Sequence, residues 1–100
     1  MIIYNVTLAV DEAIHDEWLA WMTNEHIPEV MATNKFVDYK IYKVLLEKEN
    51  SITYSVQYFA ESLAQVQLYL AQHAHELQAK SRLQYGDSVV AFRTVLEELT

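Results

Sequence analysis

The sequence predicts an α+β fold in which two β-α-β halves build one four-stranded antiparallel sheet with helices on one face. A loose internal repeat is the first reason, because Tyr4-Asn5-Val6 returns fifty positions later as Tyr54-Ser55-Val56. A second pair of related blocks, residues 26–32 and 73–79, falls in the two helical stretches. The third reason is periodicity, since strand-like alternation flanks helix-like spacing in each half. We expect residues 1–100 to form a single domain, as the chain length favours.

The first half opens with a strand over residues 2–10, where apolar and polar side chains alternate. Asp11 is placed to cap the helix that follows. Pro28 disfavours a helical backbone at Ile27, so we expect a break there and a short second helical piece that ends near Ala32. The first helix carries one apolar stripe at helical spacing: Ile14, Trp18, Trp21 and Met22.

A second strand is predicted over residues 36–46, which are rich in Val, Ile and Tyr. Asn34, just before it, suits a left-handed backbone at the end of the helix. Residues 47–51 form a polar hairpin connection to a third strand over residues 52–60. Lysines gather in this segment, as they do on edge strands that must not pair with other chains. They are Lys35, Lys40, Lys43 and Lys48.

The second helix opens at Glu61 or Ser62, and its region ends at Gly86, which accepts the positive φ of a helix terminus. Residues 88–96 then alternate as a fourth strand. The apolar stripe of the helix is Leu63, Val66, Leu70, His73 or Ala74, and Leu77. The two faces of the fourth strand are Val90, Phe92 and Leu96 against Val89, Ala91, Arg93 and Val95.

This β-α-β-β-α-β order is the ferredoxin-like arrangement, in which the first and third strands lie at the centre of the sheet. The apolar, even-numbered residues of those strands then face the helices. The opposite face presents polar side chains to water, to a partner subunit or to a ligand cavity that a partner encloses, and the repeat sets Asn5 beside Ser55 and Thr7 beside Gln57. We favour a small aromatic or carboxylate ligand on this face. The residues that we expect to bind it are Asn5, Thr7, Ser55, Gln57 and Arg93, beside Thr53.

The charge and the lack of cysteine limit the partners that this chain is expected to have. Its formal net charge is −7, and it lacks the basic stripe that nucleic acids need, so we expect no nucleic-acid partner. Without cysteine there are no disulfides, which fits a reducing, cytoplasmic setting. The sequence opens with no basic leader and holds no apolar run of about 20 residues, so we expect neither a signal peptide nor a membrane span.

Two His-x-x-Glu pairs come nearest to a metal or acid–base motif: His26 with Glu29, and His73 with Glu76. Their spacing brings an imidazole and a carboxylate together on one helix. The halves of a pseudo-two-fold fold keep the two pairs apart, so we expect no metal and no other cofactor. If the protein is an enzyme, His26 is our first candidate for its catalytic acid or base.

Other side chains have both a structural and a functional interpretation, and the structural one is favoured for each. Arg93 either pairs with an acid, Asp38 on a neighbouring strand or a glutamate of a partner subunit, or binds a carboxylate in a cavity. Trp18 and Trp21 either fill the core and an interface or line a pocket for a planar ligand. His15 and His75 are expected at the surface. A single glycine and no cysteine argue against phosphate-binding loops, nucleophile elbows and thiol catalysis.

Several segments resemble those of a small bacterial family of unknown function: MIIYNVT, HDEWLAWM, HIPEVMAT, ITYSVQYFAES, ELQA and YGDSVVAFRTVLEEL. The resemblance covers essentially the whole chain, although Asn34 stands where members often have glycine. It implies a dimeric α/β barrel, in which two ferredoxin-like subunits pair sheet against sheet, and it assigns no catalytic residues. Proteins with this architecture include cofactor-independent monooxygenases, muconolactone-isomerase-like enzymes, haem-binding members and stress-induced barrels, so the fold does not decide the function.

The sequence leaves three functions open. The favoured one is a homodimer that binds a small organic ligand on the sheet face. The second is a cofactor-independent enzyme that resembles a monooxygenase or an isomerase. The third is a structural or protein-interaction dimer.

Overall fold

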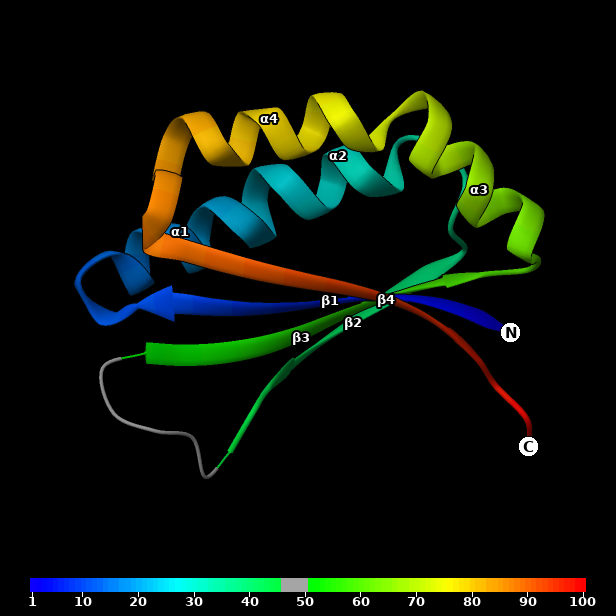
Figure 1. The fold of residues 1–100 in the computed structure, drawn as a ribbon, viewed down its shortest axis with the longest axis horizontal. Helices are drawn as coiled ribbons and strands as arrows, with labels where there is room; N and C mark the ends of the chain where they lie inside the picture. Colours follow the sequence, from blue (N-terminus) through cyan, green and yellow to red (C-terminus); the bar gives the residue numbers. More distant parts are fainter. Residues whose placement is uncertain (46–50) are drawn as a thin grey trace.

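A computed structural model describes residues 1–45 and 51–100. Figure 1 shows the helices packed on one face of a twisted sheet. The elements are β1 (Ile2–Asp11), α1 (His15–Trp21), α2 (Ile27–Met31), β2 (Asp38–Lys43), β3 (Ser51–Ala60), α3 (Leu63–Gln72), α4 (Ala74–Tyr85) and β4 (Val89–Glu97). Short 3₁₀ turns, Glu12–Ile14 and Gly86–Ser88, precede α1 and β4, and a π-helical stretch, Met22–His26, joins α1 to α2.

The sheet has the strand order β2-β3-β1-β4, and all neighbouring strands are antiparallel. The first and third strands therefore lie at its centre, which confirms the ferredoxin-like α+β prediction. Val6 lies directly opposite Val56. These two residues are also equivalent in the repeat, so the local two-fold axis that relates the two halves passes between them.

The hydrophobic core lies between the sheet and the helices. In β1 and β3 the buried residues are mainly the even-numbered ones, as expected for a sheet with one covered face. Thr53 is an odd-numbered exception, with only 7% of its surface exposed. The predicted stripe of the first helix packs on this face, where Trp18, Trp21 and Met22 are buried and Ile14 is partly buried.

The predicted second helical piece is confirmed as α2, but the backbone stays helical near His26 and Ile27, so the predicted break is wrong. Ile27 has helical angles (φ −60°, ψ −45°), and its N–H donates to the carbonyl of Met22, five residues back. A proline lacks an N–H, and its ring crowds the carbonyl four residues earlier in a regular α-helix. The wider π turn relieves that crowding, and Pro28 lies in the first turn of α2, where it needs no donor.

The second helical region does break, at His73, where one continuous stripe was predicted. His73 leaves helical geometry (φ −129°, ψ −34°), and α4 runs in a different direction from α3 (Figure 1). Leu63 and Leu70 are therefore 49% and 42% exposed, while Tyr69 faces the sheet instead. The predicted stripe residues that are buried are Val66, Ala74 and Leu77.

None of the helices in residues 1–45 and 51–100 is long and apolar enough to cross a membrane.

The predicted caps and turn residues are confirmed. Asp11 Oδ1 accepts a hydrogen bond of 3.0 Å from the N–H two residues later, and Ser62 Oγ accepts one of 3.3 Å from the N–H three residues later. Asn34 and Gly86 have positive φ angles of 61° and 53°. Local side-chain chemistry therefore sets these element ends.

The edge strand β2 is shorter than predicted, because it pairs with β3 over Asp38–Lys43 rather than over residues 36–46. Phe36 is buried in the core before the strand begins. Lys40 and Lys43 are exposed on this edge, as the lysine pattern predicted. Lys48 and all but Ser51 of the predicted hairpin connection lie outside the described residues.

Arg93 lies on the helix-covered face, so its predicted place on the open face is wrong. It stands directly opposite Val6, which belongs to the core, and directly opposed residues share a face. Thr94 stands opposite Asn5 and is the residue that joins the open face. The error has a physical reason, because both alternating sets in β4 are largely apolar and hydropathy alone does not orient the strand.

Candidate functional site

A cavity of about 430 Å³ lies between the sheet and the helices, on the β4 side of the core. Side chains of β1, β3 and β4 line it from the sheet, and side chains of the π-helical stretch, α2, α3 and α4 line it from the helices. Ligand pockets in proteins span about 300–1,000 Å³. The cavity is therefore large enough for a small organic molecule.

The inner part of this cavity is apolar. Met22 lies there, and its flexible thioether side chain adapts to irregular shapes. This part can hold the apolar body of a ligand without leaving polar groups unpaired. Its buried lining residues are Val6, Leu8, Met22, Val30 and Val56.

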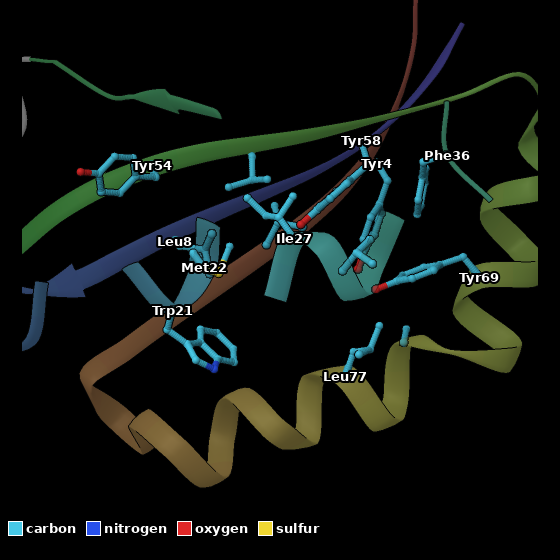
Figure 2. Close-up of a cluster of buried hydrophobic side chains, with 14 of the residues drawn as sticks. Tyr4, Leu8, Trp21, Met22, Ile27, Phe36, Tyr54, Tyr58, Tyr69 and Leu77 are labelled. Carbon is cyan, nitrogen blue, oxygen red and sulfur yellow. The ribbon is translucent and has the colours of Figure 1, made fainter. Parts of the chain in front are cut away.

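Three tyrosines line the cavity from different elements: Tyr4 from β1, Tyr58 from β3 and Tyr69 from α3. Figure 2 shows their rings grouped beside Phe36, and the ring centroids of Tyr4 and Tyr69 are 5.6 Å apart. Burial raises the pKa of all three hydroxyls, so they are neutral near pH 7 and can donate hydrogen bonds. The positive charge of Arg93 lowers the pKa of Tyr4 and Tyr69 in part, which means that its guanidinium lies near both.

The charged groups of the cavity are mainly basic. Both arginines of the chain, Arg82 and Arg93, line it. Among the acidic residues that the structure describes, only Asp87 does so. Within residues 1–45 and 51–100, neither arginine forms an ion pair with a carboxylate. The predicted ion pair of Arg93 with a neighbouring acid is therefore not found among these residues, and the guanidinium is available to a ligand.

His26, the first candidate for an acid or base, also lines the cavity. Its ring stacks on Trp21, with centroids 4.9 Å apart and planes inclined by 25°. Its Nδ1 is buried and has no hydrogen-bond partner in the described part of the chain. Burial lowers the pKa of His26, Glu29 opposes this shift, and the charges of Arg93 and Lys80 add to it. The imidazole is therefore neutral near pH 7 and keeps a lone pair that can accept a proton.

The two His-x-x-Glu pairs form no joint site. Glu29 Oε2 instead accepts a hydrogen bond of 2.7 Å from Lys80 Nζ, which ties α2 to α4. His73 marks the break between α3 and α4. No cluster of three His, Asp or Glu side chains suited to a metal occurs in the residues that the structure describes. The absence of a metal or cofactor stays a prediction.

The open face of the sheet brings together the other predicted ligand residues, as hydrogen-bond partners of one another. Ser55 Oγ donates to Asn5 Oδ1 over 2.7 Å. Asn5 Nδ2 donates to the hydroxyls of Thr7 and Thr94, over 3.4 Å and 3.3 Å. The residues directly opposite are Asn5 with Gln57 and Thr7 with Ser55, so the predicted Asn5–Ser55 contact is a diagonal one. None of these side chains lines the cavity.

His15 and Tyr54 make a contact that the sequence did not predict. His15 Nε2 lies 2.7 Å from the Tyr54 hydroxyl, and His15 Nδ1 lies 3.0 Å from Asp16 Oδ1. The side chain of His15 is only 16% exposed, so its predicted surface position is wrong, whereas His75 is exposed as predicted. This carboxylate–imidazole–phenol chain holds the start of α1 against β3, and neither His15 nor Tyr54 lines the cavity.

A wider groove of about 710 Å³ runs along the outer side of α2 and α4. It is open to solvent, and Leu83 on its border is 88% exposed. The ion pair between Glu29 and Lys80 lines it, so the one basic residue in its lining already has a partner. The cavity beneath the helices is the better candidate, because it is more enclosed and holds unpaired polar groups.

A helix-covered antiparallel sheet with a cavity between its layers and an uncovered opposite face defines a ferredoxin-like α+β protein. Within that class, the chain belongs to the family described as Domain of unknown function (DUF4286), which matches residues 1–99. This confirms the resemblance to an uncharacterised family. The family description assigns no activity, so the side chains of this chain must carry the functional argument.

Several solved structures share the fold. An ethyl tert-butyl ether D (EthD) family protein of Bacillus halodurans is 12% identical, with a TM-score of 0.69 over 99% of this chain and 100% of that one. A Deinococcus radiodurans protein, proposed to be an antibiotic biosynthesis monooxygenase, is 18% identical, with a TM-score of 0.66 over 100% and 94%. A dimeric ferredoxin-like protein from an uncultured marine organism is 13% identical, with a TM-score of 0.62 over 95% and 92%. Comparison with curated proteins gives no match. At such identities the likeness establishes the fold alone.

Proposed function

We propose that the protein binds a small organic molecule in the cavity between the sheet and the helices. The observation that carries this proposal is a partly enclosed space of about 430 Å³ in which an apolar interior meets polar groups from several elements. Small-molecule sites combine an apolar lining with a few convergent polar groups that fix the orientation of the ligand. The proposed site therefore moves from the open face of the sheet to the covered face.

The unpaired Nδ1 of His26 supports the same proposal. A buried donor or acceptor without a partner costs about 1–3 kcal/mol. A ligand that bonds to this nitrogen removes that cost, and so favours the bound state. The partly apolar, partly polar lining favours a ligand of the same mixed character.

For the open face we propose pairing with a second copy of the chain, as in a dimeric α/β barrel. Exposed apolar side chains of β4 lie on this face, opposite odd-numbered residues of β1. One structural relative is a dimeric ferredoxin-like protein. The exposed apolar residues of β4 on this face are Val90, Phe92 and Leu96, which are 51%, 68% and 41% exposed.

A ligand site on Asn5, Thr7, Ser55 and Gln57 stays a prediction, as does a cytoplasmic setting.

A cavity-filling variant tests the proposed site. Small aromatic and aliphatic compounds, charged and neutral, are added at millimolar concentration, and thermal unfolding is measured. A compound that binds the folded state raises its melting temperature by mass action. Ala91→Phe fills the cavity from β4 and should abolish the shift, while Ala64→Phe on the exposed side of α3 should keep it.

Two results would count against this site. One is an equal shift in Ala91→Phe and the wild type. The other is a set of ligand-induced amide NMR changes confined to Asn5, Thr7, Ser55 and Gln57, which would place the ligand on the open face. Absence of a shift with every compound would remove support for ligand binding altogether.

A second candidate is a cofactor-independent enzyme that moves a proton in the same cavity. The specific observation is a neutral imidazole, His26, beside a cation and neutral phenols. Such a group acts as a general base when it lies within hydrogen-bond reach of an acidic C–H. Phenylpyruvate is a suitable probe, because removal of a C3 proton lets deuterium from D₂O replace it.

Proton NMR of phenylpyruvate in D₂O separates catalysis from binding. The enzyme hypothesis expects the wild type to accelerate the loss of the C3 signal. His26→Gln should remove the acceleration and keep phenylpyruvate bound. A wild-type protein that binds phenylpyruvate without accelerating exchange acts as a binding protein towards this compound.

A further inference from the structure

We infer that the cavity takes an organic monocarboxylate, with the carboxylate held by Arg93 and the apolar body lying against Val6, Met22 and Val30. This inference rests on the proposed function, because it names the ligand class of the same cavity. It is carried by the position of Arg93 among neutral hydrogen-bond donors, without an anion of the protein's own to pair with.

The distribution of charge is the first step. The chain has twice as many acidic as basic residues, 14 against 7, yet its cavity carries two arginines and one acid. The four lysines that the structure describes all lie outside the cavity lining. Charged residues drawn at random from this chain would be acidic more often than basic. The excess positive charge at this one place favours an anionic ligand.

The surroundings of Arg93 are the second step. Arg93 lines the same cavity as Tyr4 of β1, Tyr69 of α3 and His26 of the π-helical stretch. Its positive charge acts on the pKa of all three groups. Gln78 of α4 lines the cavity as well. Four elements besides β4 thus bring neutral polar groups to one cation. Phenol hydroxyls and a side-chain amide can donate to an anion that the guanidinium holds.

The missing counter-ion is the third step. Arg93 forms no ion pair within the part of the chain that the structure describes, and Asp87 is the one acid in the lining. A guanidinium presents two parallel N–H donors that match the two oxygens of a carboxylate. Two guanidinium groups and one carboxylate leave the lining with one net positive charge, so a monoanion fits better than a doubly charged phosphate.

The apolar interior supplies the rest of the ligand class. Val6, Met22 and Val30 offer no hydrogen bonds, so the remainder of the ligand has to be apolar. Tyr58 and Tyr69 add aromatic surface on which a flat ring can pack. An arylalkyl or aryl-vinyl carboxylic acid combines both features at a size that this cavity accepts.

Cinnamate and cinnamamide form a matched pair of probes, because they share one shape and differ in charge. Isothermal titration should give at least about tenfold tighter binding of cinnamate to the wild type, as expected for hydrogen bonds to a charged group. Arg93→Gln should remove this preference while cinnamamide still binds. Arg93→Lys keeps the positive charge but lacks the two parallel N–H donors of the guanidinium, so it should restore the preference in part. Lys80→Gln makes the same change in net charge outside the cavity lining and should keep the full preference.

The outcomes separate this inference from the proposed function. Equal binding of the two probes to the wild type, or an unchanged preference in Arg93→Gln, overturns the carboxylate assignment and leaves the cavity as the ligand site. Equal loss of preference in Lys80→Gln also overturns it, because a general field effect would then explain the result. Failure of both probes and of the wider compound panel to bind overturns the proposed function itself. Arg93 is exposed on an edge strand, so Arg93→Gln should fold, and its melting temperature verifies this.

Discussion

The two faces of the sheet are built from alternate residues of the same strands, yet they treat their polar groups differently. On the open face, Asn5 bonds to Ser55, Thr7 and Thr94, so these side chains are one another's partners. On the covered face, Arg93 and His26 border a cavity; among the described residues, Arg93 forms no ion pair and His26 Nδ1 has no hydrogen-bond partner. The comparison teaches that unpaired polar groups around empty space, rather than polarity alone, mark the candidate ligand site.

The covered face also differs between its two halves, although the repeat relates them. Tyr54 is the repeat equivalent of Tyr4, but its hydroxyl bonds to His15 and its ring packs on Trp18, with centroids 5.3 Å apart. Tyr4 instead borders the cavity. The helices therefore fill one end of the covered face with a large indole and leave the other end hollow.

Removal of that indole is the largest predicted effect and tests whether the filled half carries the stability. Trp18 is fully buried, so Trp18→Ala should lower the free energy of unfolding by about 3–5 kcal/mol. Phe92→Ala on the open face removes a side chain that is 68% exposed and should cost about 0.5 kcal/mol or less in dilute solution. Urea unfolding gives both values. A similar cost for the two variants would contradict the assignment of the core to the covered face.

A charge on the open face tests its proposed role as the contact between two copies. Phe92→Glu would bury two like charges in that contact and should weaken self-association by about 2 kcal/mol or more. Leu83→Glu is the control, because Leu83 is 88% exposed on α4, away from the sheet. Sedimentation velocity measures both. Dissociation by Leu83→Glu and not by Phe92→Glu would move the interface to the helices.

Much of this comparison was predictable from the sequence. Alternation in residues 2–10 and 52–60 gave the two faces of the central strands, and the repeat indicated that these strands pair. The orientation of β4 was not predictable, because Val90 and Phe92 are as apolar as Val89 and Ala91. Only its register with β1 sends Arg93 to the covered face.

The cavity itself was beyond the sequence for a related reason. It depends on how two helical regions bend. Pro28 signals an irregularity in the first region but not that a π turn absorbs it, and the break at His73 has no clear local signal. The contact between His15 and Tyr54 joins residues 39 positions apart, with no pattern that links them. One signal was available, since both arginines of an acidic chain lie in its last fifth.

High pH should weaken the covered face in particular. Burial raises the pKa of Tyr58 above its ordinary value of about 10, so the folded state holds this proton more tightly than the unfolded state. Its contribution to stability is complete below pH 10 and is lost as the pH rises beyond it, by at most about 1.4 kcal/mol per pH unit. Urea unfolding between pH 9 and 11.5 should show a shallower fall for Tyr58→Phe than for the wild type. An unchanged slope would mean that this hydroxyl reaches water.

Tyr4 and Asn5 give the smallest and most discriminating test, because these neighbours in β1 point to opposite faces. Asn5→Ala removes the centre of the open-face hydrogen bonds and should lower the free energy of unfolding by about 1 kcal/mol, with cinnamate binding unchanged. Tyr4→Phe keeps the packed ring and removes the hydroxyl beside Arg93, so it should weaken cinnamate binding several-fold with a smaller effect on unfolding. Titration and urea unfolding of both variants give the four values. If Asn5→Ala weakened binding and Tyr4→Phe did not, the ligand would lie on the open face, and the polar groups that bond to one another there would be the site after all.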